Sequence, residues 1–163
     1  KVEASPTGGR LEFSDQTQVE PIALVKLVQT QPATYQLAGA TTLRFIRTPG
    51  HTPGVLSTRF TVYDQGYPHV AFMFGGVGLN FSGIERTESY INSVERLQQL
   101  PNIEANIPNH QDSGEVFERY EILKDRRDGD PHSFVDPESW NAWLDILLLN
   151  AQSKLEREKL ETR

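Results

Sequence analysis

The segment TPGHTPG, from Thr48 to Gly54, separates two strand-like stretches and decides how the chain is interpreted. It holds His51, one of four histidines, between two Pro-Gly turns. The preceding residues 43–47 (LRFIR) follow the pattern of a half-buried strand, and residues 55–64 (VLSTRFTVYD) are β-branched and aromatic. We therefore predict two strands joined by a rigid corner that carries a histidine.

The composition is that of an ordinary globular domain. The chain has 163 residues, of which 37% are hydrophobic and 23% charged, within the usual range for one domain. Its net charge of −6 disfavours nucleic acid or an anionic membrane as a partner, because both need clustered Lys and Arg. The absence of cysteine excludes disulfides, thiolate metal sites and a cysteine nucleophile. No apolar run approaches the roughly 20 residues of a membrane span, so we predict none.

Further strands and helices follow the corner. A turn at Gln65-Gly66 leads to a third strand over 67–74, and short turns favour antiparallel neighbours. The glycines of residues 75–83 (GGVGLNFSG) indicate an irregular loop, and residues 103–107 a short strand. We expect three helices: one capped by Thr87, one capped by Ser113, and one opened by Asp136-Pro137. Their apolar stripes are Tyr90, Ile91, Val94 and Leu97; Val116, Phe117, Tyr120 and Leu123; and Trp140, Trp143, Leu144, Leu147, Leu148, Ala151 and Leu155.

The ends of the chain are less informative. Residues 1–35 are expected to be loop or linker-like, although residues 21–28 (PIALVKLV) form a short apolar helix or strand. The last turns (KLEREKLETR) are charged and are expected to project into solvent. The sequence opens without an initiator Met, so we expect that Lys1 is not the first residue of the gene product.

Two histidines are candidates for a metal site. His51 and His110 each follow a predicted strand on a turn, where a sheet can hold catalytic groups rigidly. Neutral imidazole is also the commonest zinc-binding side chain. Two histidines so distant in sequence are, by spacing alone, more often ordinary turn residues. Asp112 or Glu115 could orient His110, or could equally face solvent or cap a helix.

The other histidines and motifs favour no alternative chemistry. We expect His69 to be structural within a strand, and His132 to cap a helix or to bond a backbone carbonyl. The glycine-rich loop lacks both G-x-G-x-x-G and a Walker lysine, which argues against a nucleotide site. No G-x-S-x-G elbow suggests an acyl-transfer triad.

Taken together, the motifs resemble a known family. TPGHTPGVLS after a strand, a strand pair ending in FMFGG, and a strand ending in PNH are similar to the second half of the metallo-β-lactamase fold. The tail DRRDGDPHSFVDPESWNAWLDILLLNAQSKLEREK resembles the subclass that binds zinc without a cysteine ligand. The match covers residues 36–163, so residues 1–163 would be one partial domain of an α/β, αββα sandwich with a mainly antiparallel or mixed sheet.

The resemblance implies a zinc-dependent hydrolase. His51 would be the third histidine on the first of two zinc ions, and His110 a ligand of the second. Zinc-bound hydroxide would attack an amide or ester carbonyl of a small-molecule substrate, with β-lactam as the leading expectation. Relatives of this subclass are often exported, which implies a periplasmic or secreted location.

Two departures from the family pattern limit this expectation. The motif H-x-H-x-D-H, which belongs to the first half of the fold, is absent. Each zinc would therefore receive one ligand here, whereas catalytic zinc normally has about three. Gly75-Gly76 stands where many relatives carry a metal-binding Asp or Cys. We expect the chain alone to be inactive, with a missing N-terminal half or another chain completing the sandwich. The alternatives are a non-catalytic fold-half that acts as an assembly module, and structural roles for both histidines.

Overall fold

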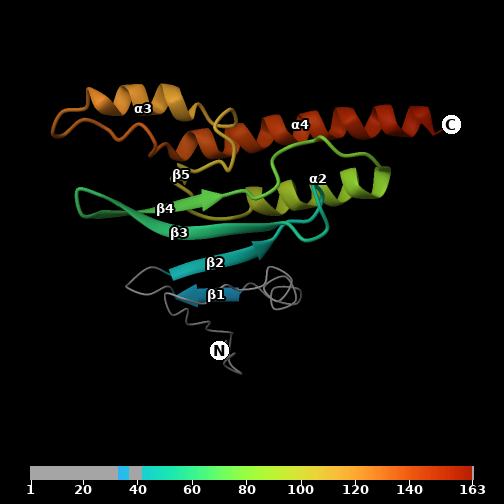
Figure 1. The fold of residues 1–163 in the computed structure, drawn as a ribbon, viewed down its shortest axis with the longest axis horizontal. Helices are drawn as coiled ribbons and strands as arrows, with labels where there is room; N and C mark the ends of the chain where they lie inside the picture. The colour runs from blue at the N-terminus through green and yellow to red at the C-terminus, as the bar shows by residue number, and fades with distance from the viewer. Residues whose placement is uncertain (1–32, 37–41, 163) are drawn as a thin grey trace.

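A computed structural model describes residues 33–36 and 42–162 (Figure 1). The chain order of the elements is β1 (Ala33–Gln36), β2 (Thr42–Arg47), β3 (Leu56–Asp64), β4 (Tyr67–Met73), α2 (Ile84–Gln98), β5 (Ala105–Asn106), α3 (Val116–Lys124) and α4 (Pro137–Glu161). The strands expected on either side of the TPGHTPG corner and the one after Gln65-Gly66 are confirmed. β1 was not predicted, and the apolar segment 21–28 lies outside the described residues.

The strands form one mixed sheet in the order β1-β2-β3-β4-β5. The first four strands are antiparallel neighbours, and β5 pairs with β4 in parallel. The β3–β4 hairpin closes tightly because Gln65 and Gly66 both have positive φ, of 48° and 87°. Such two-residue turns match the right-handed twist of the strands that they join.

Strand direction places three loops at one end of the sheet. β2 and β4 are both antiparallel to β3, so they run in the same direction, and β5 is parallel to β4. The C-terminal ends of β2, β4 and β5 therefore meet at one end. The segments that follow these strands contain His51, the glycine-rich loop and His110.

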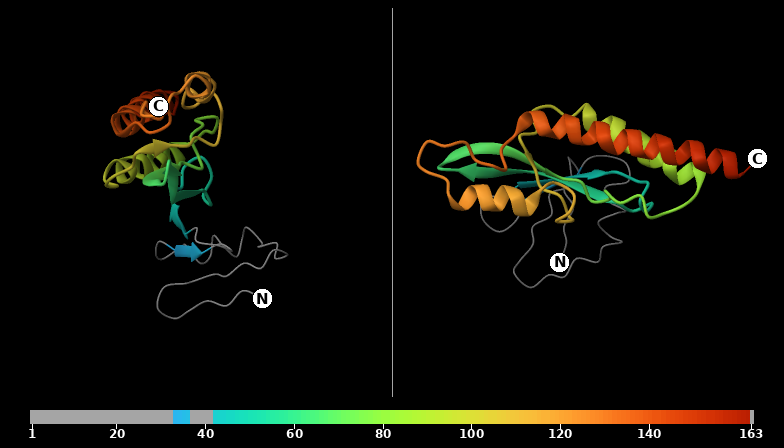
Figure 2. Two further views of the ribbon diagram at one scale, coloured as in Figure 1. Left: turned by 90° about the vertical axis from the view of Figure 1, so that its left-hand side faces the viewer. Right: turned by 90° about the horizontal axis from the view of Figure 1, so that it is seen from above.

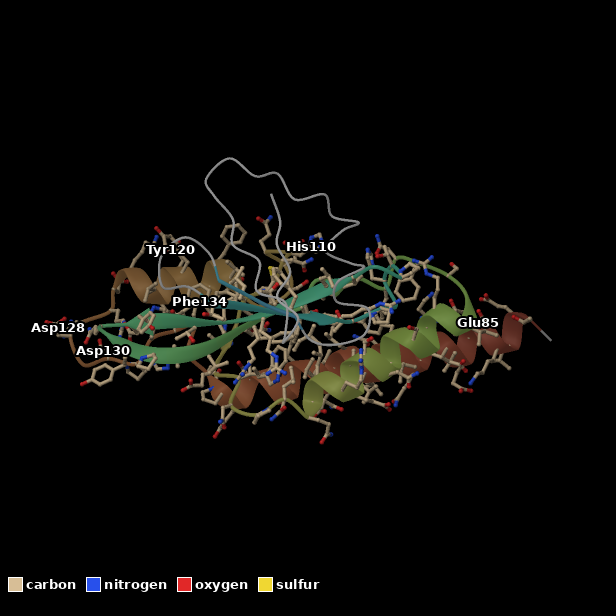
Figure 3. All side chains as sticks on the ribbon, turned by 90° about the horizontal axis from the view of Figure 1, so that it is seen from below. Glu85, His110, Tyr120, Asp128, Asp130 and Phe134 are labelled. Carbon is tan, nitrogen blue, oxygen red and sulfur yellow. The ribbon has the colours of Figure 1, made fainter. Side chains whose placement is uncertain are left out.

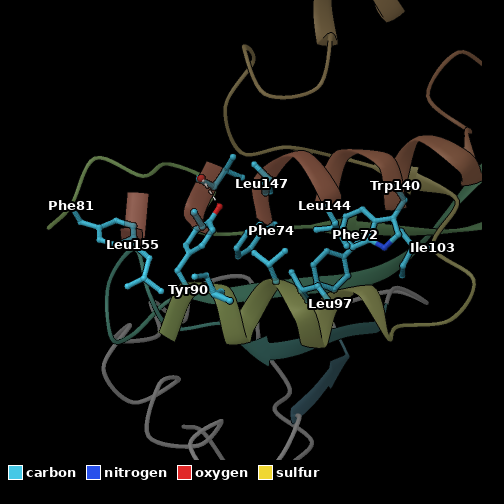
Figure 4. Close-up of a cluster of buried hydrophobic side chains, with 14 residues drawn as sticks. Phe72, Phe74, Phe81, Tyr90, Leu97, Ile103, Trp140, Leu144, Leu147 and Leu155 are labelled. Atoms are coloured by element: carbon cyan, nitrogen blue, oxygen red, sulfur yellow. Dashed lines mark hydrogen bonds between the residues drawn. The ribbon is translucent and has the colours of Figure 1, made fainter. Parts of the chain in front are cut away.

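The hydrophobic core lies between the sheet and two helices. α2 and α4 cover one face of the sheet, whereas α3 lies on the other side (Figures 1 and 2). Phe72 of β4 and Phe74, just after its end, are fully buried between the two helices and the sheet, as Figure 4 shows. The helices contribute Tyr90, Val94, Leu97, Trp140, Leu144, Leu147, Ala151 and Leu155. The apolar stripes predicted for α2 and α4 are thus confirmed. Burial of each large apolar side chain stabilises the fold by about 1.5–3 kcal/mol.

The start of α2 differs from the prediction. The helix begins at Ile84 after Gly83, which has a φ of 115°, and Thr87 lies inside the first turns rather than capping them. The Thr87 hydroxyl is buried and donates to Glu158 Oε2 at 2.7 Å. Glu158 Oε1 also accepts from the Gly83 N–H at 3.0 Å. A carboxylate of α4 therefore takes the place of a local cap at this helix end.

Consequently the end of α4 is not simply a solvated tail, as we had expected. The side chains of Lys154 and Glu158 are only 15% and 12% exposed, and their ion pair spans 2.8 Å. Leu155 belongs to the core. The predicted opening of α4 is correct, because Asp136 Oδ1 accepts from the Ser139 N–H and Pro137 begins the helix.

The predicted apolar stripe of α3 is wrong, because none of its residues is buried. Phe117 and Tyr120 are 58% and 52% exposed. The helix begins after Glu115, a residue in left-handed conformation, and Ser113 does not cap it. α3 is held by polar contacts instead: Arg119 donates to the Ser133 carbonyl oxygen at 2.8 Å, beside a cavity of about 600 Å³.

Within residues 42–162, no helix combines the length and the apolar character needed to cross a bilayer.

Candidate metal centre

The chain segment from Arg47 to His51 lies along one face of α2. Arg96 donates to the Arg47 carbonyl oxygen at 2.8 Å, and the Ser93 hydroxyl to the Pro49 carbonyl oxygen at 2.7 Å. Two turns before Ser93 on α2, Arg86 donates to the carbonyl oxygens of Gly50 and His51. Residues three or four apart share a helix face. One stripe of α2 therefore fixes the corner residue by residue.

Gly50 explains why the corner needs a glycine before the histidine. Its φ is +143°, and an added Cβ would lie 2.4 Å from Tyr90 Cα. Side-chain-bearing residues rarely adopt such a backbone conformation, and contact at that distance cannot occur without movement of α2. Close packing of the Gly50 backbone against α2 therefore fixes the position of the His51 backbone.

The imidazole of His51 is oriented by the glycine-rich loop. His51 Nδ1 lies 2.8 Å from the Gly78 carbonyl oxygen, which can only accept. Nδ1 therefore carries the proton, and in the neutral ring Nε2 keeps a lone pair that is available to a metal. Phe81 packs edge-on against the imidazole, with ring centroids 6.0 Å apart. In histidines that bind zinc, the ring nitrogen that does not bind the metal usually donates its proton to a carbonyl, a carboxylate or water.

The structure gives a steric reason for Gly75 and Gly76. A Cβ on Gly75 would lie 2.0 Å from the Leu56 carbonyl oxygen, and one on Gly76 would lie 3.0 Å from His51 Cβ. A side chain at position 75 would require the backbone to shift, and one at position 76 would press against the side chains of His51 and Val55. The sequence departure from relatives that carry Asp or Cys is therefore built into the packing.

His110 lies on the loop that follows β5. Figure 3 shows it exposed on the side of the sheet away from α2 and α4. Just before it, the Asn109 side-chain amide donates to the Gly75 carbonyl oxygen at 2.9 Å. The Ser113 N–H closes the turn on the His110 carbonyl oxygen at 3.0 Å. The loops of both histidines are therefore bonded to the same short segment, one at Gly75 and the other at Gly78.

The side chains near His110 do not support the expected orienting role. Glu115 lies 3.7 Å from Arg119 in an ion pair that points along α3. Asp112 is exposed, and no hydrogen bond joins it to His110 among the described residues. In the part of the chain that the structure describes, no three His, Asp or Glu side chains are grouped closely enough to hold a metal ion.

The remaining histidines have structural partners, although His132 accepts from a backbone N–H rather than bonding the expected carbonyl. His69 Nδ1 lies 3.3 Å from Glu104 Oε1, and the Val70 N–H donates to the other oxygen of that carboxylate at 2.9 Å. The Val70 bond, assisted by His69, lowers the pKa of Glu104 despite some opposing burial. His132 Nδ1 accepts from the Phe134 N–H within its own loop.

Sequence reasoning missed Gly78, Phe81 and Arg86. A backbone acceptor such as the Gly78 carbonyl leaves no trace in the sequence. Arg86, by contrast, shares the i, i+4, i+7 spacing of Tyr90 and Ser93, so the helix face was visible although its use was not.

No protein-family model matches the sequence. No curated protein sequence matches it either. Solved structures do match. BJP-1, a subclass B3 metallo-β-lactamase of Bradyrhizobium japonicum, aligns with a TM-score of 0.66 and 19% identity over 77% of this chain and 49% of its own. The native FEZ-1 metallo-β-lactamase of Legionella gormanii gives 0.66 and 20% over 77% and 52%. The Rm3 metallo-β-lactamase gives 0.61 and 23% over 80% and 56%.

The chain has part of the metallo-β-lactamase fold. At these identities the likeness is one of fold, and the chain spans about half the length of the structures that it matches. The expectation of a partial metallo-β-lactamase sandwich is therefore confirmed, with a mixed sheet and flanking helices. The roles of His51 and His110 as metal ligands stay predictions.

Proposed function

We propose that the chain is one half of a zinc-dependent hydrolase, to which His51 and His110 each contribute one imidazole. The main support is the attachment of both histidine loops to the Gly75–Gly78 segment, through Asn109 and through His51 Nδ1. The metallo-β-lactamase fold gives the proposal its context.

The described residues provide the right type of donor for zinc but too few ligands. Imidazole nitrogen is a preferred zinc donor, and the bond from His51 to Gly78 leaves the nitrogen of the correct tautomer available. Catalytic zinc normally needs about three protein ligands. No group of three is present within the described ranges. We therefore derive no hydrolytic step for this chain alone and expect it to be inactive by itself.

A completed site would act on a carbonyl compound. Bound zinc lowers the pKa of a coordinated water to near 7, which provides a nucleophile for an amide or ester. The contribution of this chain would be to present both imidazoles at the end of the sheet where β2, β4 and β5 end, with the ring of His51 oriented by Gly78. β-Lactam is the leading substrate class, because the matching structures are described as metallo-β-lactamases. Export to the periplasm is part of the same proposal.

The proposed partner is the half of the sandwich that the matched structures have in addition. One sheet with α2 and α4 on one face supplies two layers, whereas an αββα sandwich needs four. A preceding N-terminal segment or another chain would supply the second pair. That partner would bring the H-x-H-x-D-H motif, and the ligand would be a small molecule rather than nucleic acid.

The second candidate function is a non-catalytic fold-half that assembles with itself or with another protein. The observation in its favour is the incomplete ligand set among the described residues. Mass and metal content of the purified 163-residue chain separate the two possibilities. A zinc-free dimer, inert when joined to an H-x-H-x-D-H half, would favour the assembly module.

The hydrolase proposal is tested on the completed protein. We expect about two zinc ions per molecule and loss of activity with a chelator. His51→Ala and His110→Ala should each reduce zinc content, while His132→Ala, whose ring contacts Phe134 of its own loop, should not. Full activity and zinc content of the His51→Ala, His110→Ala double variant would refute the assigned roles.

A further inference from the structure

We propose that Arg86 is a positioning residue for His51, an inference that rests on the proposed metal site. Arg86 lies in the first turn of α2, and its guanidinium joins two consecutive carbonyl oxygens of the corner. Nε donates to Gly50 at 3.4 Å, and a terminal nitrogen donates to His51 itself. A planar guanidinium has several donors in fixed geometry, so one side chain can hold both peptide groups.

The same guanidinium also supports the ring that packs on the imidazole. The Arg86 guanidinium carbon lies 4.9 Å from the centroid of Phe81, over the ring face. Phe81 is buried and makes the edge-on contact to His51 at 6.0 Å. Cations over an aromatic face are attracted by its quadrupole. Arg86 therefore reaches His51 by two routes, through the backbone and through Phe81.

These contacts complement the bond to Gly78. The Gly78 carbonyl fixes which ring nitrogen carries the proton. Arg86 fixes the peptide from which the side chain projects, and Phe81 limits the tilt of the ring. Metal sites depend on such supporting contacts, because the ligand nitrogen must be held within about 0.5 Å of its productive position.

Arg96 provides a matched control on the same helix. It is exposed like Arg86, and it also donates to a backbone carbonyl oxygen of the corner segment, that of Arg47 at 2.8 Å. It lies at the far end of the segment from His51. If substitution merely loosened the contacts between α2 and the corner, variants of Arg86 and of Arg96 would behave alike. If Arg86 positions His51, only the Arg86 variant should alter the His51 ring.

The first experiment uses the metal-free 163-residue chain. Long-range proton–nitrogen NMR on histidine-labelled protein reports the tautomer of each ring, at about pH 8.5 where imidazoles of ordinary pKa are neutral. We expect wild type and Arg96→Gln to show His51 as a single Nδ1–H tautomer with a slowly exchanging proton. Arg86→Gln should show mixed tautomers and fast exchange, and Arg86→Lys an intermediate state. A wild-type His51 spectrum in Arg86→Gln overturns the proposal.

Unfolding of Arg86→Gln would be detected from the other histidines, and a second variant would then replace it. His69 and His132 serve as internal references, because their rings have other partners, Glu104 and the Phe134 N–H, away from the corner. Should Arg86→Gln unfold, Phe81→Leu tests the aromatic route while Arg86 keeps its bonds to Gly50 and His51, although the Phe81 ring also packs against Tyr90. Mixed His51 tautomers in that variant support the proposal, and an unchanged ring overturns it.

The second readout is zinc affinity in the completed protein, measured by competition with a chromophoric chelator. Loss of a supporting contact typically weakens metal affinity by about 10- to 100-fold. We expect a loss in this range for Arg86→Gln and none for Arg96→Gln. Equal affinities for both variants overturn the proposal. A wild-type protein that binds no zinc refutes the proposed function instead, and the tautomer measurement still decides whether Arg86 positions His51.

Discussion

Replacement of Gly50 by alanine tests whether direct packing against α2 builds the corner. The new Cβ would lie 2.4 Å from Tyr90 Cα and 2.7 Å from its backbone nitrogen. A backbone nitrogen and Cα cannot rotate away, so either α2 or the corner has to move. Overpacking of this kind costs about 1–3 kcal/mol. The φ of +143° adds a strain of about 1–3 kcal/mol for a residue with a side chain.

The sum for Gly50→Ala is about 2–6 kcal/mol, which is a large part of the total stability of a domain. Gly66 is the matched control. It also has positive φ, of +87°, but a Cβ there would meet no atom within 4 Å. Gly66→Ala should therefore cost only the backbone strain, about 1–3 kcal/mol.

Urea unfolding followed by tryptophan fluorescence gives both free energies of unfolding on one scale. The difference between the two variants isolates the contact with α2, because backbone strain is common to both. We expect Gly50→Ala to be the less stable variant by at least about 1 kcal/mol. Equal destabilisation of the two variants would show that the corner does not depend on contact with Tyr90.

Three other changes probe separate parts of the fold. Glu158→Ala leaves the buried Thr87 hydroxyl without its acceptor and should cost about 1–3 kcal/mol in urea unfolding. Contacts with Lys154, Thr87 and Gly83 lower the pKa of Glu158 although burial, the largest single influence, opposes them. This stabilisation is complete above the unfolded pKa of about 4.3 and disappears as pH falls through the lower folded value. Glu158→Gln should flatten the acid limb of stability against pH, and an unchanged limb would contradict the assignment. Leu144→Ala, at a fully buried site, should lower the free energy of unfolding by about 2–5 kcal/mol; a loss below 1 kcal/mol would argue against the packing of α4 on the sheet. Asn109→Ala removes the bond to Gly75, so chemical-shift changes should appear in the His110 loop and around Gly75, and an unaffected loop would show that the bond does not tether it.

Local patterns predicted the elements whose causes are local. The β3–β4 hairpin follows from β-branched and aromatic residues on either side of Gln65-Gly66. The start of α4 follows from Asp136-Pro137, because the cap and the proline act within one turn.

The errors arose where a distant residue decided the outcome. Thr87 resembled a cap, but the true start of α2 depends on Glu158, far along the chain. The apolar stripe of α3 had helical spacing, yet the inward side of that helix is occupied by the polar contacts of Arg119. Periodicity predicts that a helix has an apolar face, not that an apolar surface is available to receive it.

The candidate site shows the same division. His51 and His110 were recognisable from their turns. The state of the His51 ring depends on the Gly78 carbonyl and on Phe81, both brought to it by tertiary structure. Such contacts follow from how β2, β4 and α2 pack, which no window of sequence contains.

The hydrogen bonds between Glu158 and the first turn of α2 determine how far the C-terminus can be truncated. Gly83 and Thr87 are held from the last two turns of α4, and Arg86 stands between them on the helix that carries the corner. Truncation after Glu161 would remove the exposed Thr162 and its bond to the Glu158 carbonyl oxygen, but not the Glu158 carboxylate. Truncation before residue 158 would remove the bonds that hold the first turn of α2. Because Arg86 lies in that turn, the position of His51 would change as well.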